Sequence, residues 1–312
     1  MEAEIKKRLQ ELAPDRVRFD APLAGLTTLQ IGGPAEVLIE PESLEQLRGV
    51  MNLVRRESLP WFILGGGSNV LFDDQGFSGV VLRLGQGFAS LRVLESGGDE
   101  VLVEAGAAAL TAGLLSLSRR QGLSGLEFLA GIPGRLGGAL AMNAGAQGGQ
   151  VMDAVHSLEV LEASNNLGRL DRDELRASYR QLDLPPGTVI LKGIFRLHRA
   201  TTEEVGARIE QVLTRRRQTQ PHGVRSAGCV FKNPPGDSAG RLIDRAGLKG
   251  RQIGQVWVSE EHANFIVHRG RATSGQVLEL MEIIRRDVKG KFGVELEPEI
   301  KIVGRAPQEG RT

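Results

Sequence analysis

The sequence predicts a protein of mixed helices and strands with more than one compact lobe. Amphipathic helical stripes alternate along the chain with short apolar strand patterns. The 41 glycines gather in a few stretches and do not form Gly/Ser repeats, which indicates loops that approach a ligand closely rather than flexible linkers. With 312 residues, the chain is long enough for two or three domains.

Composition argues against several classes of protein. The net charge of +1 gives no overall attraction to nucleic acid or to an anionic membrane. No apolar run is long enough to cross a membrane, and the start of the chain lacks the apolar segment of a secretion signal, so we expect a cytoplasmic protein. The single cysteine, Cys229, cannot form an internal disulfide. Because no Cys/His cluster has zinc spacing, we expect no metal.

The first part of the chain predicts helix, strand, helix and strand in turn. Residues 1–13 have one apolar side, and residues 28–40 hold two short strands broken at a Gly-Gly-Pro. Ser43 and Gln46 form a capping box that begins an amphipathic helix, and residues 59–64 have the pattern of a buried strand.

A glycine loop follows this strand directly and consists of Gly65, Gly66, Gly67, Ser68 and Asn69. It lacks the glycine spacing of the dinucleotide fingerprint and the Gly-Lys-Ser/Thr of a P-loop, and the chain continues as a strand rather than a helix. Consecutive glycine amides can form an anion nest, which favours ligand contact over the alternative, a plain tight turn.

A second glycine-rich stretch covers residues 122–146, after predicted strands at 79–84, 91–94 and 101–105 and a helix at 110–120. A turn is expected at Ile132-Pro133-Gly134. The small residues Gly137, Gly138 and Ala139 would let an isoalloxazine ring or a pyrophosphate lie against the main chain, and Asn143 offers both donors and acceptors. Close packing of two elements is the structural alternative.

The second half predicts strands at 155–163 and 188–197, then a helix that a capping box at Thr201 begins. Its inward stripe is Val205, Ile209, Val212 and Leu213, and it ends in Arg215, Arg216 and Arg217, which complement the helix dipole. A helical turn at 240–250, strands at 256–258 and 265–267, a helix capped by Thr273 and a strand within 293–304 complete the pattern.

Cys229 lies in a stretch that we expect to form a short strand. Alternation would place Cys229 and Phe231 on one face and Lys232 on the other, and Asn233 with the prolines that follow would end the strand. A thiol, an ammonium and an amide would then lie close together. Taken alone, a single cysteine is more often a small buried apolar residue.

These stretches together resemble the UDP-N-acetylenolpyruvoylglucosamine reductase (MurB) family, in family order over nearly the whole chain. The matching segments are Ile31–Ala35, Leu64–Leu71, Gly125–Gly134, Gly137–Ala139, Met142–Ala146, Tyr179-Arg180, Ser226–Pro234, Ala239–Asp244, Ala246–Gly250, His262–Ile266 and Leu296–Ile300.

The resemblance implies an α+β fold with a two-part FAD-binding domain of the vanillyl-alcohol oxidase type and a smaller α+β substrate-binding domain. The expected boundaries are 1–75 together with the C-terminal strand 296–304, then 76–200, then 201–295, followed by a disordered tail at 305–312. It also implies that the two glycine stretches bind FAD non-covalently, through Gly65, Gly66, Gly67, Ser68, Asn69, Gly131, Ile132, Pro133, Gly134, Gly137, Gly138, Ala139, Asn143, Ala144 and Gly145.

Carried over by position, the catalytic residues are Arg180, Glu299 and Cys229, with Cys229 where many members have serine as the proton donor. The implied reaction is reduction of a nucleotide-sugar enolpyruvyl group with NADPH, and the implied protein is a monomer without nucleic-acid or membrane partners. The expected substrate contacts are Tyr179, Lys232, Asn233 and Arg217. A nearby Lys232 would lower the pKa of the thiol from its ordinary value of about 8.5.

Three departures from the family pattern accompany the resemblance. Leu182 stands where a serine commonly supports the arginine, His268 stands where asparagine is common, and the chain lacks a longer loop with a substrate-binding tyrosine. Two alternatives stay open: an FAD oxidase with covalently bound flavin, against which the absence of His and Cys from the glycine stretches argues, and a binding protein without catalysis.

Overall fold

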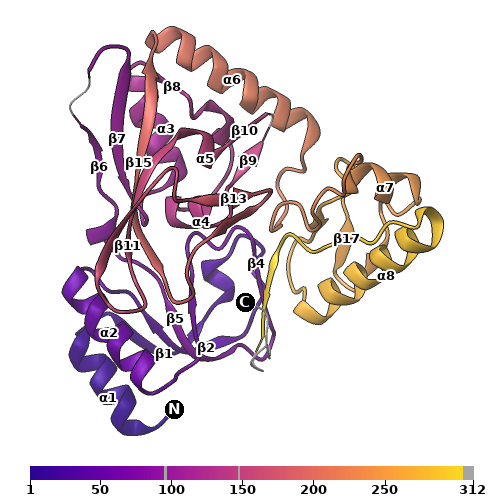
Figure 1. Cartoon of the computed structure of the whole chain (residues 1–312). Helices are drawn as coiled ribbons and strands as arrows, with labels where there is room; N and C mark the ends of the chain where they lie inside the picture. Colours follow the sequence, from indigo (N-terminus) through magenta and orange to yellow (C-terminus); the bar gives the residue numbers. More distant parts are fainter. Residues whose placement is uncertain (95–96, 147, 305–312) are drawn as a thin grey trace.

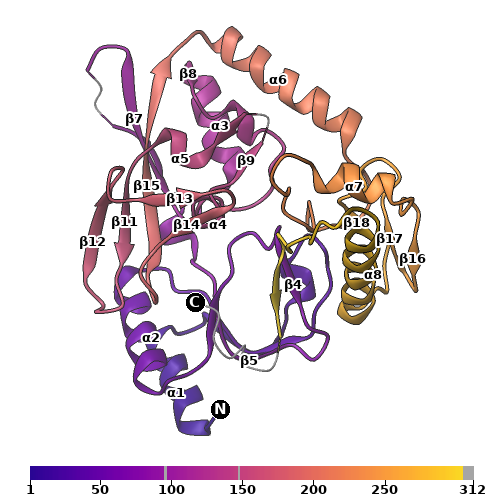
Figure 2. The same ribbon diagram turned by 45° about the vertical axis from the view of Figure 1, so that its right-hand side comes forward.

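The chain folds into three lobes in the computed structural model, which describes residues 1–94, 97–146 and 148–304. The first lobe carries helices α1 and α2, the second carries a large antiparallel sheet, and the third is a smaller unit around α8 (Figure 1). Figure 2 shows the third lobe beside the other two, with α6 running above them. Within these described residues, no helix is both long and apolar enough to cross a membrane, and no three acidic, His or Cys side chains form a metal cluster.

The first lobe contains a four-stranded sheet in the order β1-β2-β5-β3. The strands are β1 (Val17–Pro22), β2 (Pro34–Ile39), β3 (Trp61–Ile63) and β5 (Phe77–Leu82), and the helices are α1 (Ala3–Leu12) and α2 (Leu44–Arg56). Ser43 caps α2 as expected, because its side chain accepts a hydrogen bond from Gln46 N. Since β5 pairs in parallel with both β2 and β3, we group it with this lobe and not with the segment expected to begin at residue 76.

The end of the described chain returns to the first lobe. Strand β19 (Lys301–Val303) pairs in parallel with β4 (Val70–Phe72), with Lys301 opposite Val70. Figure 1 shows this yellow strand crossing back from the third lobe. The pairing fixes the residues just before β19 next to the glycine loop that precedes β4. The expected tail at 305–312 lies outside the described residues.

The second lobe is built on an antiparallel sheet in the order β12-β11-β15-β7-β6, with β8 also paired to β15. Its strands are β6 (Leu91–Val93), β7 (Glu100–Gly106), β8 (Leu123–Ser124), β11 (Val155–Leu161), β12 (Leu167–Asp171) and β15 (Val189–Arg199). Two small antiparallel pairs, β9 (Gly145–Ala146) with β10 (Gly149–Gln150) and β13 (Arg176–Ser178) with β14 (Gln181–Asp183), accompany it.

The helices of this lobe are α3 (Thr111–Arg120), α4 (Leu136–Ala141) and α5 (Val151–Ala154). Leu136 and Leu140 of α4 are fully buried in the core with Phe195 of β15. The sequence pattern did not predict α4, because two adjacent glycines are poor helix formers. Packing explains Gly137, since a Cβ there would lie 3.0 Å from Ala107 Cβ.

The third lobe consists of α7 (Ala239–Arg245), α8 (Ser274–Phe292) and an antiparallel sheet of β16 (Gln252–Ile253), β17 (Val256–Val258) and β18 (Ile266–Val267). Its apolar core includes Leu29 and Leu71 of the first lobe, which joins the two lobes.

Helix α6 (Thr202–Thr219) packs differently from the expectation that placed it with the third lobe. Its buried Val205 and Ile209 form a small cluster with Ala130 of the second lobe. We therefore group α6 by packing with the second lobe, from which it extends towards the third (Figure 2).

Candidate flavin and substrate site

The two glycine stretches, far apart in sequence, are in direct contact. Ser68 Oγ donates to the carbonyl oxygen of Pro133 at 2.9 Å. A Cβ built on Gly66 would lie only 2.4 Å from Gly134 Cα, so these two backbones can approach only because residue 66 has no side chain. The two stretches therefore form one continuous surface of main chain.

Glycines on this surface are of two kinds. At Gly67, φ is +65° and a Cβ would lie 2.1 Å from the carbonyl oxygen of Leu26, so protein packing alone requires glycine there. At Gly138, in α4, a Cβ would meet no described atom within 4 Å. Packing does not explain Gly138, and its main chain is left open to a bound ligand. The residues present therefore fit FAD.

Two side chains expected to contact the cofactor are instead engaged with other protein segments. Asn143, buried and with φ of +40°, donates to Gln150 Oε1 and to the carbonyl oxygen of Ser178, and accepts from Met152 N. Asn69 Nδ2 donates to the carbonyl oxygen of Glu299 at 3.0 Å. Asn69 thus holds the backbone of the predicted catalytic residue Glu299, and Asn143 holds the strand that leads to Arg180.

The other predicted cofactor residues line or support the same surface. The carbonyl oxygen of Ile132 accepts from Thr111 Oγ1, Ala139 is buried in α4, Ala144 packs against the core, and Gly145 pairs with Gln150. Gly131 packs on α6, because a Cβ there would lie 2.8 Å from Arg216 Cδ.

Arg180 and Glu299 form an ion pair although 119 positions separate them. Arg180 Nε donates to Glu299 Oε1 at 2.8 Å, and the two side chains are 20% and 12% exposed. Arg180 lies in the turn between β13 and β14 with φ of +61°, and its guanidinium lies 4.9 Å from the ring centroid of the half-exposed Tyr179. Leu182, the departure from the family pattern, is buried in the main core and anchors this hairpin by packing.

Cys229 lies beside this ion pair. Its segment does not form the expected regular strand and makes isolated bridges, from Cys229 to Phe265 and from Phe231 to Pro298. Glu299 N donates to the carbonyl oxygen of Val230 at 2.7 Å. Three segments from different parts of the sequence therefore bring an arginine, a carboxyl group and a thiol together.

Burial and the neighbouring Glu299 raise the pKa of the Cys229 thiol to about 12. The positive charges of Arg180 and Arg216 and a hydrogen bond from the Asn264 side chain oppose this rise. The expectation that Lys232 lowers this pKa is wrong, since Lys232 Nζ lies 3.4 Å from Glu297 Oε2 and the shift is upward. Burial likewise raises the pKa of Glu299, against the opposing effect of Arg180.

Arg216 and Arg217 differ in what they face. The exposed Arg217 forms an ion pair with Glu210 on the outer face of α6 and also donates to Thr214 Oγ1. Arg216 is half-buried beside Cys229 and Arg180, and its Nε meets no hydrogen-bond acceptor among the described residues. Burial lowers the pKa of Arg216. Of the two arginines, the one facing the site is therefore Arg216 and not the expected Arg217.

Helix periodicity could have identified Arg216 from the sequence. The buried residues Val205 and Ile209 are followed at helical spacing by Val212 and then Arg216, so Arg216 continues the middle of the inward stripe. Asn233, another expected substrate contact, accepts from Ala239 N at 3.0 Å at the start of α7. Its side-chain oxygen is thus already used in capping.

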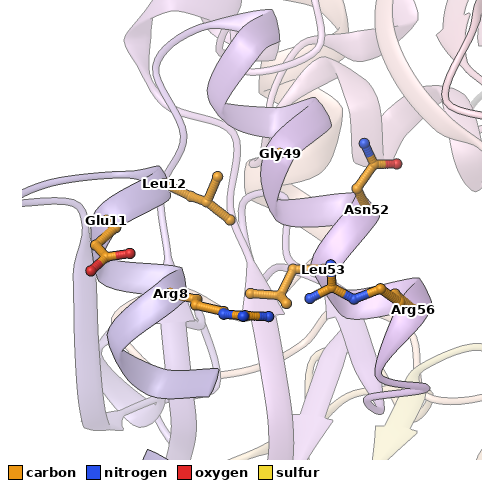
Figure 3. A pocket seen from close by; sticks show the side chains of 7 residues that line it. All are labelled: Arg8, Glu11, Leu12, Gly49, Asn52, Leu53 and Arg56. Atoms are coloured by element: carbon orange, nitrogen blue, oxygen red, sulfur yellow. The ribbon is translucent and has the colours of Figure 1, made fainter. Parts of the chain in front are cut away.

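A separate shallow pocket lies between α1 and α2 (Figure 3). Arg8, Leu12, Asn52 and Arg56 are among its lining residues, and it contains none of the predicted site residues. A Cβ on Gly49 would lie 2.7 Å from Leu12 Cδ2, which shows that glycine allows the close helix contact at its base.

Comparison with known proteins agrees with this geometry. An FAD binding domain model matches residues 35–171, and the model of the C-terminal domain of UDP-N-acetylenolpyruvoylglucosamine reductase matches residues 220–303. A VAO-type flavoprotein from Myceliophthora thermophila shares the fold, with a TM-score of 0.50 at 10% identity over 96% of this chain and 63% of that chain. The chain is therefore a flavoprotein with the vanillyl-alcohol oxidase type of FAD-binding fold.

Relatives of higher identity define the family. The UDP-N-acetylenolpyruvoylglucosamine reductase of Caldanaerobacter subterraneus is 42% identical over 96% of this chain and 98% of the relative, and that of Geotalea uraniireducens is 41% identical over 97% and 99%. The crystal structure of MurB from Thermus caldophilus matches with a TM-score of 0.78 and 38% identity, over 92% of this chain and 98% of that one. The chain belongs to the UDP-N-acetylenolpyruvoylglucosamine reductase (MurB) family.

Proposed function

We propose that this protein reduces UDP-N-acetylglucosamine enolpyruvate to UDP-N-acetylmuramate, with NADPH as electron donor, in the cytoplasmic synthesis of peptidoglycan precursors. Family membership supports the substrate and the reaction class. The observation that carries the mechanism is the meeting of Arg180, Glu299 and Cys229 beside the joined glycine stretches.

Bound FAD would supply hydride transfer from NADPH to the enolpyruvyl double bond. Negative charge then develops on the carbon next to the substrate carboxylate. Arg180 suits this position because a guanidinium is planar and stays charged, and it offers several N–H donors to an oxyanion. Its hydrogen bond to Glu299 fixes its orientation in advance.

Cys229 completes the reaction in this proposal by giving its proton to the carbanionic carbon. The S–H bond breaks, a C–H bond forms, and the thiolate regains a proton from water. A thiol with a pKa of about 12 stays protonated throughout the neutral range, so Cys229 carries its proton before the transfer. The adjacent Arg180 and Arg216 stabilise the thiolate that the transfer leaves behind.

Arg216, Tyr179 and Lys232 are the proposed contacts to the anionic parts of the nucleotide sugar. Within the arginine cluster 215–217 expected to contact the substrate phosphates, Arg216 is the proposed contact in place of Arg217, because it faces the site and lacks a carboxylate partner among the ion pairs of the described residues. Asn233 is assigned to the same region through its NH₂ group, since its oxygen is occupied.

Purified protein provides the first test. We expect a yellow protein whose flavin appears in the supernatant after acid precipitation, and NADPH oxidation that requires the enolpyruvyl nucleotide sugar. Flavin retained on the precipitate would favour the oxidase alternative. Flavin release without NADPH oxidation would favour a binding protein.

A further inference from the structure

Asn264 holds the segment that carries Cys229 through both ends of its amide. It lies in the loop between β17 and β18 and is 3% exposed. Its Oδ1 accepts from Phe231 N at 3.0 Å, and its Nδ2 donates to the carbonyl oxygen of the same residue at 2.8 Å. Its own carbonyl oxygen accepts from Val230 N at 2.8 Å. The two residues after Cys229 are thus fixed to one asparagine.

The loop that carries Asn264 is itself held in place. Asn264 N donates to His262 Nδ1 at 3.2 Å, and Phe265 N donates to the carbonyl oxygen of His262 at 2.9 Å. Phe265 then bridges back to Cys229 across an antiparallel contact. The Asn264 amide therefore fixes the backbone immediately after Cys229.

We propose that Asn264 is a positioning residue for proton transfer: its amide fixes the backbone of the Cys229 segment, and from this anchored position it supplies its second N–H to the sulfur. This inference rests on the proposed role of Cys229 as proton donor. An amide N–H can donate to sulfur but cannot accept from it, so the S–H proton stays free to point towards the substrate. After transfer, the same N–H stabilises the thiolate, consistent with the hydrogen bond that opposes the rise in the thiol pKa.

Asn264→Asp separates this role from simple support of the backbone. A protonated aspartic acid can still accept from Phe231 N and donate its single proton to the carbonyl oxygen of Phe231, but it has no second donor for the sulfur. An ionised aspartate would instead repel a thiolate. In both forms the thiolate is disfavoured while the shape of the side chain is kept.

The decisive experiment is a double-mutant cycle between Asn264→Asp and Cys229→Ala. Stopped-flow absorbance would follow flavin reduction by NADPH and flavin reoxidation by UDP-N-acetylglucosamine enolpyruvate separately. We expect Asn264→Asp to slow reoxidation about tenfold, the factor for one lost hydrogen bond to a charged group, and to leave reduction unchanged. In the Cys229→Ala background, the same substitution should add less than about twofold.

Equal slowing of reoxidation in both backgrounds would overturn the proposal, as would equal slowing of both half-reactions. If Cys229→Ala alone leaves reoxidation unchanged, the proposed role of Cys229 fails, and that result is visible without any change at Asn264.

Thiol alkylation by iodoacetamide at pH 9 gives a readout that needs neither flavin nor substrate. The inference predicts slower alkylation in Asn264→Asp than in the unmodified protein, because the thiolate loses a donor. Faster alkylation would mean that the substitution merely loosens the segment, and it would overturn the inference.

Discussion

The flavin side of this site is formed by main chain, whereas the substrate side is formed by side chains. On the flavin side, two glycine stretches meet main chain to main chain, and Gly66 and Gly134 approach closer than any side chain would permit. On the substrate side, Arg180, Glu299 and Cys229 act through side chains that three distant segments bring together. Changes on one side should therefore alter flavin binding, and changes on the other should alter turnover of the enolpyruvyl substrate.

The largest expected effect concerns the reactivity of Cys229. At pH 8 a thiol with a pKa of about 12 is deprotonated roughly 10³-fold less than one at its ordinary value, so alkylation in the folded protein should be slower by about that factor. Unfolding in urea should restore the ordinary rate. An alkylation rate in the folded protein equal to that of a free cysteine would contradict the protonated state of this partly buried thiol.

The same shift predicts how stability depends on pH. Well below the ordinary thiol pKa of about 8.5, the thiol is protonated in both the folded and the unfolded chain, so its contribution to stability is fully present. As the pH rises from about 9 towards about 12, only the unfolded chain ionises, and the contribution is lost. Cys229→Ala should therefore flatten the loss of stability in this alkaline range, as measured by urea unfolding at several pH values.

Arg180→Lys should slow flavin reoxidation by the enolpyruvyl substrate about 10²-fold, because lysine keeps the charge but loses the planar N–H fork. Flavin affinity and the NADPH half-reaction should stay near normal, since the hydrogen bond and ring contact of the Arg180 side chain among the described residues go to Glu299 and Tyr179. Loss of flavin from Arg180→Lys would contradict the claim that changes on the substrate side leave flavin binding unaltered.

The adjacent residues Arg216 and Arg217 provide a matched pair of substitutions that tests which arginine binds the nucleotide sugar. Arg216→Met should raise the KM for the nucleotide sugar about tenfold or more, because a half-buried cation facing the site is lost. Arg217→Met removes an exposed ion pair with Glu210 and a hydrogen bond to Thr214, and it should change KM less than about twofold. Equal changes in KM for the two substitutions would contradict the assignment of Arg216 as the substrate contact.

Gly138→Ala tests the flavin side with the smallest change. A Cβ at this position meets no described atom, and alanine is the better helix former, so the flavin-free protein should be as stable or up to about 1 kcal/mol more stable. The Kd for FAD should nevertheless rise about tenfold, or roughly 1.4 kcal/mol. Unchanged affinity would mean that the open space above Gly138 does not hold the flavin.

The sequence alone identified the parts of the site formed by local glycine stretches. It was less informative about the side chains that come together from distant positions in the sequence. Each glycine stretch could be identified as a candidate ligand loop, because consecutive glycine amides can form an anion nest and small residues let a ring lie against the main chain. The trio of Arg180, Glu299 and Cys229 could be chosen only through family resemblance, because no local pattern links positions so far apart.

Helix α4 and the role of Asn143 depended on tertiary packing that no local pattern contains. Helix α4 forms in a glycine-rich stretch because Leu136 and Leu140 bury their side chains. Asn143 was expected to face the cofactor, but its amide is used in tertiary hydrogen bonds. Arg216 could have been found by extending the apolar stripe of α6 by one more turn.

The most direct test of the division into two sides is the stopped-flow comparison of Cys229→Ala with Cys229→Ser in each half-reaction. General acid catalysis is typically worth about 10²–10⁴-fold in rate, so Cys229→Ala should slow flavin reoxidation by that order and leave NADPH-driven bleaching near normal. Cys229→Ser should retain much more activity, because a hydroxyl can also donate a proton. If Cys229→Ala slows both half-reactions equally, or neither, Cys229 is a buried structural thiol and the account of the substrate side is contradicted.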